Sequence, residues 1–176
     1  MIRSIASTLR PGPVVLLALL LPSVAGAGTL VVDASGGGDF PDLPPAIAAA
    51  APGDTIVVRD GVYSAFTVGK PLALVAEAGQ TPAAAAAVVT GIPPAGEVSI
   101  GGLALGRVEL RDSSGAIHLD DCDVVESTLH NDPACLIDRC RRVTLSRCHV
   151  TGTKQAYPDV AIRGTTRILN SLAVVS

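Results

Sequence analysis

The sequence has 176 residues, a formal net charge of −3 and 48% hydrophobic residues, but only 2% aromatic residues and no tryptophan. Its lysines are Lys70 and Lys154 alone, and this charge balance argues against nucleic acid as a partner. So few aromatic rings are typical of a narrow interior filled by stacked aliphatic side chains, and not of an ordinary globular core.

Residues 1–27 have the features of a secretory signal peptide. Arg3 and Arg10 form a positive n-region, residues 14–21 are the apolar core, and 25–27 form a small-residue cleavage site. The apolar run is short for a bilayer span, although an uncleaved N-terminal anchor is the alternative. We therefore expect a secreted, periplasmic or cell-surface protein with one domain over residues 28–176 and no later membrane span.

The segment 29–79 opens with a short apolar strand and a Gly/Asp turn. Asp42 is placed to cap a short helix near 44–51, Pro44 and Pro45 suit its first turn, and Pro52-Gly53 ends it. The small side chains of this predicted helix can lie flat over the open end of a stack of strands, so we expect a capping helix. The alternative is an amphipathic helix of an ordinary α/β domain.

Beyond the entry, the pattern apolar-x-apolar-x-x-apolar-x-apolar recurs with starts at residues 98, 117, 143 and 167, after an incomplete copy at residue 72. Alternation by two predicts one inward and one outward face, and the central pair predicts a bend at 120–121, 146–147 and 170–171. Residues 80–96 interrupt the series and are predicted to be a loop around one strand at 87–90. The predicted inward stacks are Ile100/Leu119/Leu145/Leu169, Leu105/Val124/Val150/Val174 and Leu103/Cys122/Cys148/Leu172.

Three stretches of the entry carry a family resemblance: VVDASGGGDF (31–40), PAIAAAAPGD (45–54) and IVVRDGVY (56–63). They resemble the N-terminal entry of pectin-lyase-like right-handed β-helix proteins, above all of pectin methylesterases and secreted β-helix repeat proteins. Together with the repeat, the resemblance implies an all-β, right-handed parallel β-helix, a solenoid of about five coils with an N-terminal capping helix.

Four cysteines give two pairs of candidates. Cys122 and Cys148 share a repeat position one coil apart, so we expect both to be buried and stacked, about 5 Å apart at Cα. That spacing permits a disulfide, although parallel stacking gives poor geometry for one. Cys135 and Cys140 flank four residues of a predicted loop, where a local disulfide and two free thiols are alternatives. A zinc site there, completed by a histidine, lacks the usual spacing.

Acidic residues and histidines gather in the second half of the sequence. Asp120, Asp121 and Asp123 are candidate calcium ligands, together with Asp112, Glu126 and Asp132. Interleaved arginines favour the alternative, which is charges paired across coils. The histidines are candidate bases, and Asp123 and His149 share a repeat position, as a catalytic dyad or as a surface pair. The three histidines of the sequence are His118, His130 and His149.

The motifs that carry the two aspartates of pectin methylesterases are missing from the sequence, and no pectate lyase arginine can be assigned. The leading hypothesis is a non-catalytic extracellular β-helix module related to polysaccharide lyases and esterases, with an extracellular polysaccharide as partner and no cofactor beyond the possible calcium. The alternatives are the N-terminal part of a carbohydrate-active enzyme of pectate lyase or pectin esterase type, and a surface adhesin or structural repeat protein.

The last copy of the repeat runs into Val174-Val175-Ser176 without a capping segment. An open end of stacked strands exposes backbone donors and acceptors that recruit other strands. We therefore expect either a fragment of a longer β-helix or self-association through this open coil.

Overall fold

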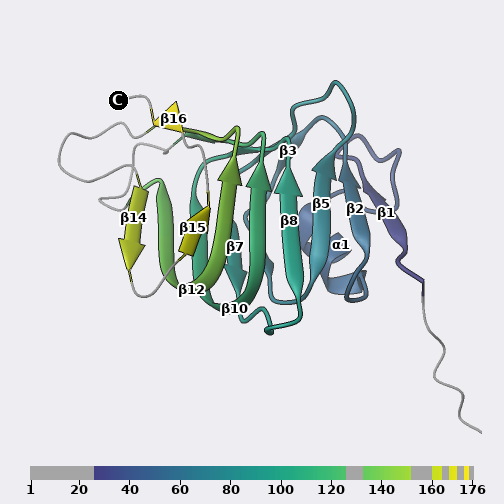
Figure 1. Ribbon diagram of the computed structural model, residues 1–176. Coiled ribbons are helices and arrows are strands. Elements are labelled where there is room, and N and C mark those ends of the chain that lie inside the picture. The colour runs from purple at the N-terminus through teal and green to yellow at the C-terminus, as the bar shows by residue number, and fades with distance from the viewer. Residues whose placement is uncertain (1–25, 126–132, 152–159, 164–166, 170–172, 175–176) are drawn as a thin grey trace, which may run out of the picture.

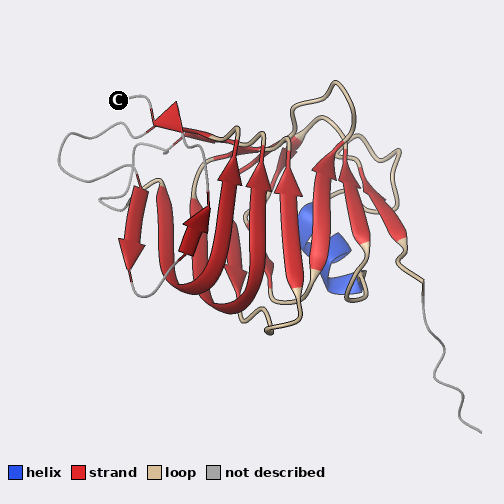
Figure 2. Cartoon of the chain, in the orientation of Figure 1, coloured by secondary structure: helices blue, strands red, loops and turns tan. Residues whose placement is uncertain are grey.

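A computed structural model describes residues 26–125, 133–151, 160–163, 167–169 and 173–174 (Figure 1). Within these residues the chain is mostly β-structure, with parallel strands in a strongly curled sheet and one short helix near the N-terminal end (Figure 2). In the described part of the chain, no helix is both long enough and apolar enough to cross a membrane. Most of the predicted signal peptide, together with His130, Leu172 and the final two residues, lies outside the described residues.

The strands form three parallel ladders. The first ladder contains β1 (Thr29–Val32), β2 (Thr55–Val58), β5 (Leu72–Ala76), β8 (Glu97–Gly101), the later halves of β10 (Val108–Asp120) and β12 (Cys135–Ser146), and β15 (Arg167–Leu169). The second contains β3 (Val62–Tyr63), β6 (Ala83–Ala84), β9 (Ala104–Leu105), β11 (Asp123–Val125), β13 (His149–Thr151) and β16 (Ala173–Val174). The third contains β4 (Phe66–Val68), β7 (Ala87–Thr90), the earlier halves of β10 and β12, and β14 (Val160–Arg163).

From β2 onward the chain visits the ladders in a constant order: first, second, third, and then first again. One round through the three ladders is called a passage. Each passage therefore lays its strands beside the corresponding strands of the passage before. In Figure 1 the strands β1, β2, β5 and β8 stand side by side, and β10 and β12 curve from one ladder into the next.

The predicted helix is confirmed as α1 (Leu43–Ala49). The Asp42 side chain accepts a hydrogen bond from the Leu43 backbone N–H, as an N-cap does, and the two prolines lie in the first turn. The helix contacts β1 and β4 and buries its apolar side chains Leu43, Ala46 and Ile47. It therefore covers the interior near the N-terminal end of the ladders.

The predicted inward rows are largely confirmed. Ile100, Leu119 and Leu145 of the first predicted row pair in consecutive strands of the first ladder and are almost fully buried. Leu74, which was not predicted to belong to the row, extends it to β5. In the second ladder all four members of the predicted row pair in register: Leu105, Val124, Val150 and Val174. Leu103, Cys122 and Cys148 are also buried, as predicted. These aliphatic rows and thiols form the core along most of the described chain.

Two predictions about the repeat are wrong in part. Leu169 pairs with Thr144 and not with Leu145, because the last passage is displaced by one residue in the first ladder while Val174 keeps its predicted partner in the second. The strand at Ala87–Thr90 is confirmed, but residues 80–96 also contain β6, which joins the second ladder. This segment thus completes a passage. The two alanines of β6 gave no strand signal because the strand is too short for alternation and alanine is depleted in strands.

The predicted bends at 120–121 and 146–147 are confirmed as corners between the first and second ladders. Asp121 and Arg147 both have left-handed backbone conformations, with φ of 54° and 52°, and Gly102 occupies the same corner one passage earlier with φ of 74°. A second corner, between the third and first ladders, has left-handed Asp112 and Arg139 in register. Non-glycine residues rarely adopt this conformation, so the sharp turn of the chain determines the backbone there.

Candidate functional site

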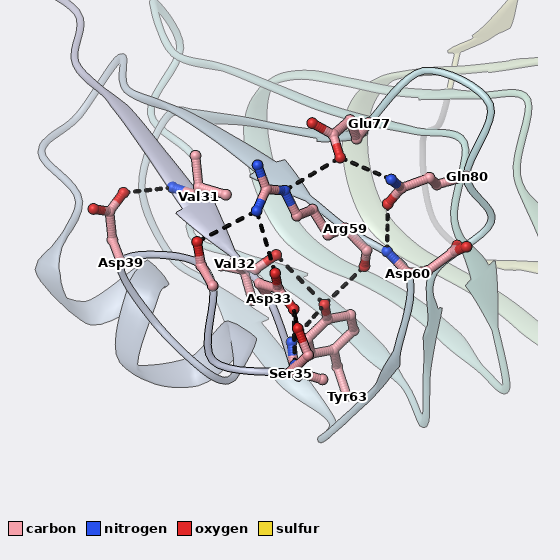
Figure 3. A network of polar contacts seen from close by, with 12 residues as sticks. Val31, Val32, Asp33, Ser35, Asp39, Arg59, Asp60, Tyr63, Glu77 and Gln80 are labelled. Carbon is pink, nitrogen blue, oxygen red and sulfur yellow. Dashed lines mark hydrogen bonds and ion pairs between the residues drawn. The ribbon is translucent and has the colours of Figure 1, made fainter.

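A network of polar contacts lies where β1, β2 and β5 end (Figure 3). The last residues of these strands pair in register, and each is followed by a charged residue. These charged residues are Asp33, Arg59 and Glu77, so the sign of the charge alternates from strand to strand. Arg59 lies between the two carboxylates, with its Nη1 3.2 Å from Asp33 Oδ2 and its Nε 3.2 Å from Glu77 Oε2. Ser35 donates to Asp33 from both its hydroxyl and its backbone N–H, and these hydrogen bonds lower the pKa of Asp33 below its usual value.

Tyr63 and Gln80 extend this network to the neighbouring loops. The Tyr63 hydroxyl donates to the Arg59 carbonyl at 2.7 Å and accepts from the Ala34 N–H at 3.2 Å, while burial raises the pKa of this phenol. Gln80 donates to Glu77 at 2.8 Å and accepts from the Asp60 N–H at 2.6 Å. Asp33 and Glu77 both contact Arg59, so the network ties together the first three strands of the first ladder.

A shallow groove lies on the outer face of the second ladder and has a volume of about 290 Å³. Small residues of β6, β9 and the loops after them line it, and the valines Val62 and Val125 stand beside them with 84% and 49% of their surfaces exposed. Gly106 is required at the groove, because a Cβ there would lie 2.5 Å from the Ala85 carbonyl oxygen. Among the described residues that line the groove, Asp123 alone carries a charge.

Asp123 and His149 pair in register on consecutive strands of the second ladder. They share this ladder position with Val62, Ala83 and Ala104, so the row runs from the groove to His149. Among the described residues no ion pair joins Asp123 to His149 or to any other side chain. His118 lies on the first ladder instead, with its Nε2 3.8 Å from Glu97 Oε1.

The candidate calcium ligands are dispersed in the structure. Asp120 forms an ion pair with Arg147, and Asp112 pairs with Arg139 at 2.6 Å, each across consecutive passages of the chain. Asp121 occupies a corner, and Glu126 and Asp132 lie outside the described residues. In the described part of the chain no three His, Cys, Asp or Glu side chains converge on a point where they could hold a metal ion.

All four cysteines are buried free thiols, so the structure has no bridge between Cys135 and Cys140. Both residues lie on β12 and not in the loop that was predicted: Cys135 begins its third-ladder half, and Cys140 follows that half. Burial raises the pKa of the Cys135 thiol to about 12.

Sequence reasoning missed the Asp33–Arg59–Glu77 network and the groove. A signal for the network exists in the sequence, because each of its three charged residues directly follows the apolar end of a strand in the entry. The groove has no comparable signal, since alanines are its main component.

Comparison with protein-family models, with curated proteins and with solved structures gave no match. The function of the chain is therefore inferred from its geometry and from the resemblance in its entry.

Proposed function

We propose that this chain is a secreted, right-handed parallel β-helix module of about five coils, related to polysaccharide lyases and esterases, which binds an extracellular polysaccharide without cleaving it. The fold proposal is supported by the constant order in which the chain visits the three parallel ladders. A chain that repeats this order winds about one axis and stacks like residues above one another, as the aliphatic rows do.

The groove on the second ladder carries the binding proposal. Its floor crosses the strands β3, β6 and β9, so its length follows the direction in which the passages stack. An extended polymer fits such a groove, because its apolar C–H faces can pack on alanine and valine while hydroxyl groups reach Asp123. No aromatic ring lies among the described lining residues, so we expect weak binding, with Kd on the order of 1 mM.

The carboxylates of the groove favour binding without hydrolysis of the polysaccharide backbone. Hydrolysis of a glycosidic bond generally requires two carboxyl groups on either side of the scissile bond. Asp123 is the single carboxylate among the described residues that line the groove, and its neighbour in register is His149. The sequence also lacks the motifs that carry the acid pair of pectin methylesterases.

A titration followed by NMR tests this function. Oligogalacturonides, xylo-oligosaccharides and cello-oligosaccharides are added in turn to the labelled chain, and saturable shifts at groove residues are expected for one class. Ala104→Gln places a larger neutral side chain in the groove and should weaken binding by about tenfold, which corresponds to about 1.4 kcal/mol.

Thr67→Gln is the matched control, because Thr67 is exposed on β4 of the third ladder and is not part of the groove lining. It should leave binding unchanged while both variants keep the circular dichroism spectrum of the parent. Absence of saturable shifts with all three classes, or equal weakening by the two variants, would overturn the binding proposal. Release of shortened products would favour an enzyme instead.

A further inference from the structure

Cys122 and Cys148 enter the core at equivalent corners of consecutive passages. Each follows a residue with a left-handed backbone, Asp121 with φ of 54° and Arg147 with φ of 52°. The chain therefore turns in the same way before both cysteines, and both side chains point inward with 1% of their surfaces exposed.

The backbones of the two cysteines are adjacent. The His149 N–H donates to the Cys122 carbonyl oxygen at 2.9 Å, and the residues that follow the cysteines, Asp123 and His149, pair in register. Neighbouring strands lie about 4.8 Å apart. This spacing falls within the Cα separation of about 4.4–6.8 Å that disulfides span.

Both thiols lean toward the passage before their own. The Cys122 thiol donates to the Ile100 carbonyl oxygen at 3.5 Å, away from Cys148, so the Cys122 side chain must rotate before the two sulfurs can bond. The Cys148 thiol donates to the Leu119 carbonyl oxygen at 3.4 Å, which places its sulfur toward the passage that holds Cys122. The neighbouring Cys122 thiol lowers the pKa of Cys148 to about 7, although burial opposes this, and Cys148 raises the pKa of Cys122.

We propose that Cys122 and Cys148 are an oxidation site, at which a disulfide joins two consecutive passages of the chain. The oxidant is a small disulfide such as oxidised glutathione. The thiolate of one of the two cysteines attacks one sulfur of the oxidant, forms a mixed disulfide and releases one glutathione thiolate. The other cysteine then gives up its proton and attacks the protein sulfur of the mixed disulfide, which releases the second glutathione. Two protein thiols are oxidised and one glutathione disulfide is reduced.

Burial determines when this exchange takes place. Both sulfurs are inaccessible in the folded chain, so the oxidant reaches them during folding or when the corners open locally. The other two cysteines are less suited to the bond. Cys135 pairs in register with Val108 and Val160, and Cys140 pairs with Ser113, so neither has a cysteine beside it on a neighbouring strand.

Peptide mapping tests the proposal. The full chain is reduced, unfolded and refolded in a mixture of reduced and oxidised glutathione; free thiols are then alkylated, and the chain is digested for mass spectrometry. We expect a peptide pair linked through Cys122 and Cys148, with Cys135 and Cys140 alkylated. The linked chain should also unfold at higher urea concentration than the reduced chain, because the bond restricts the unfolded state.

Two variants identify the bond, and their outcome does not depend on whether the groove binds a polysaccharide. Cys148→Ser should abolish the linked peptide and the dependence of the urea midpoint on oxidation, whereas Cys135→Ser should preserve both. Alkylation of all four cysteines in the refolded parent chain, or a link from Cys148 to Cys135, would overturn the proposal. The parent map gives this answer even where a serine variant does not fold.

Discussion

Replacing Gly115 by alanine tests how closely the corner between the third and first ladders is packed. Gly115 lies in β10, where the pairing with β12 shifts between Ser113 and Ala116. A Cβ at this position would lie 2.4 Å from the Gly96 carbonyl oxygen and 2.5 Å from the Pro93 carbonyl oxygen. Cβ atoms essentially never approach another atom within 3.0 Å, and both contacts are to backbone, so the segment 92–96 must move.

The expected cost follows from what this movement disturbs. The Gly115 N–H donates to the Ile92 carbonyl, and the Ala116 N–H donates to the Gly96 carbonyl, both at 3.0 Å. Each hydrogen bond contributes about 1 kcal/mol net, and crowding of a packed site costs about 1–3 kcal/mol more. We therefore expect Gly115→Ala to lower the free energy of unfolding by about 3–5 kcal/mol, a large part of the total of about 5–15 kcal/mol that is typical of a domain.

Urea unfolding followed by far-ultraviolet circular dichroism measures this change. The matched control is Gly69→Ala, because a Cβ at Gly69 would meet only the Thr90 carbonyl oxygen, at 3.9 Å. That variant should stay within about 0.5 kcal/mol of the parent. If both variants unfold at the same urea concentration as the parent, the corner is less tightly packed than the structure indicates.

Three further predictions concern the thiols, acid stability and activity. All four cysteines should resist alkylation in the native, reduced chain and react after unfolding, because each is almost fully buried; rapid native alkylation of Cys122 and Cys148 would contradict this. The urea concentration at the unfolding midpoint should be lower at about pH 3 than at about pH 7. Hydrogen bonds from Ser35 to Asp33, from Gly28 to Asp54 and from Arg139 to Asp112 hold the pKa values of these carboxyls below 3.8 in the folded chain. Their ionised forms therefore stabilise the fold above pH 3.8, and this stability is lost as the pH falls through the folded-state pKa values. An unchanged midpoint would show that these hydrogen bonds add no stability. Finally, we expect neither cleavage nor demethylation of pectin, with or without calcium, and turnover that disappears in Asp123→Ala would refute this.

The local features of the fold could be predicted because each depends on residues close together in the sequence. The start of α1 depends on Asp42, which caps the helix, and on Pro44 and Pro45 in its first turn. Inward rows such as Ile100/Leu119/Leu145 follow from alternation by two within each copy of the repeat, since parallel pairing places like positions side by side. The corners at Asp121 and Arg147 were visible as polar pairs between two apolar halves.

The features that could not be predicted depend on how one passage of the chain lies beside the next. The displacement that pairs Leu169 with Thr144 leaves Val174 opposite Val150, so it arises from the path length of a single passage, which a regular repeat does not encode. The groove likewise results from small residues that meet only when β6 and β9 pair. By itself, then, the sequence determined the parallel strands, the capping helix and which side chains face inward, because these follow from local spacing. Only the tertiary structure decided which charges pair and where the outer surface is hollowed, because each requires the lateral register of strands far apart in the sequence.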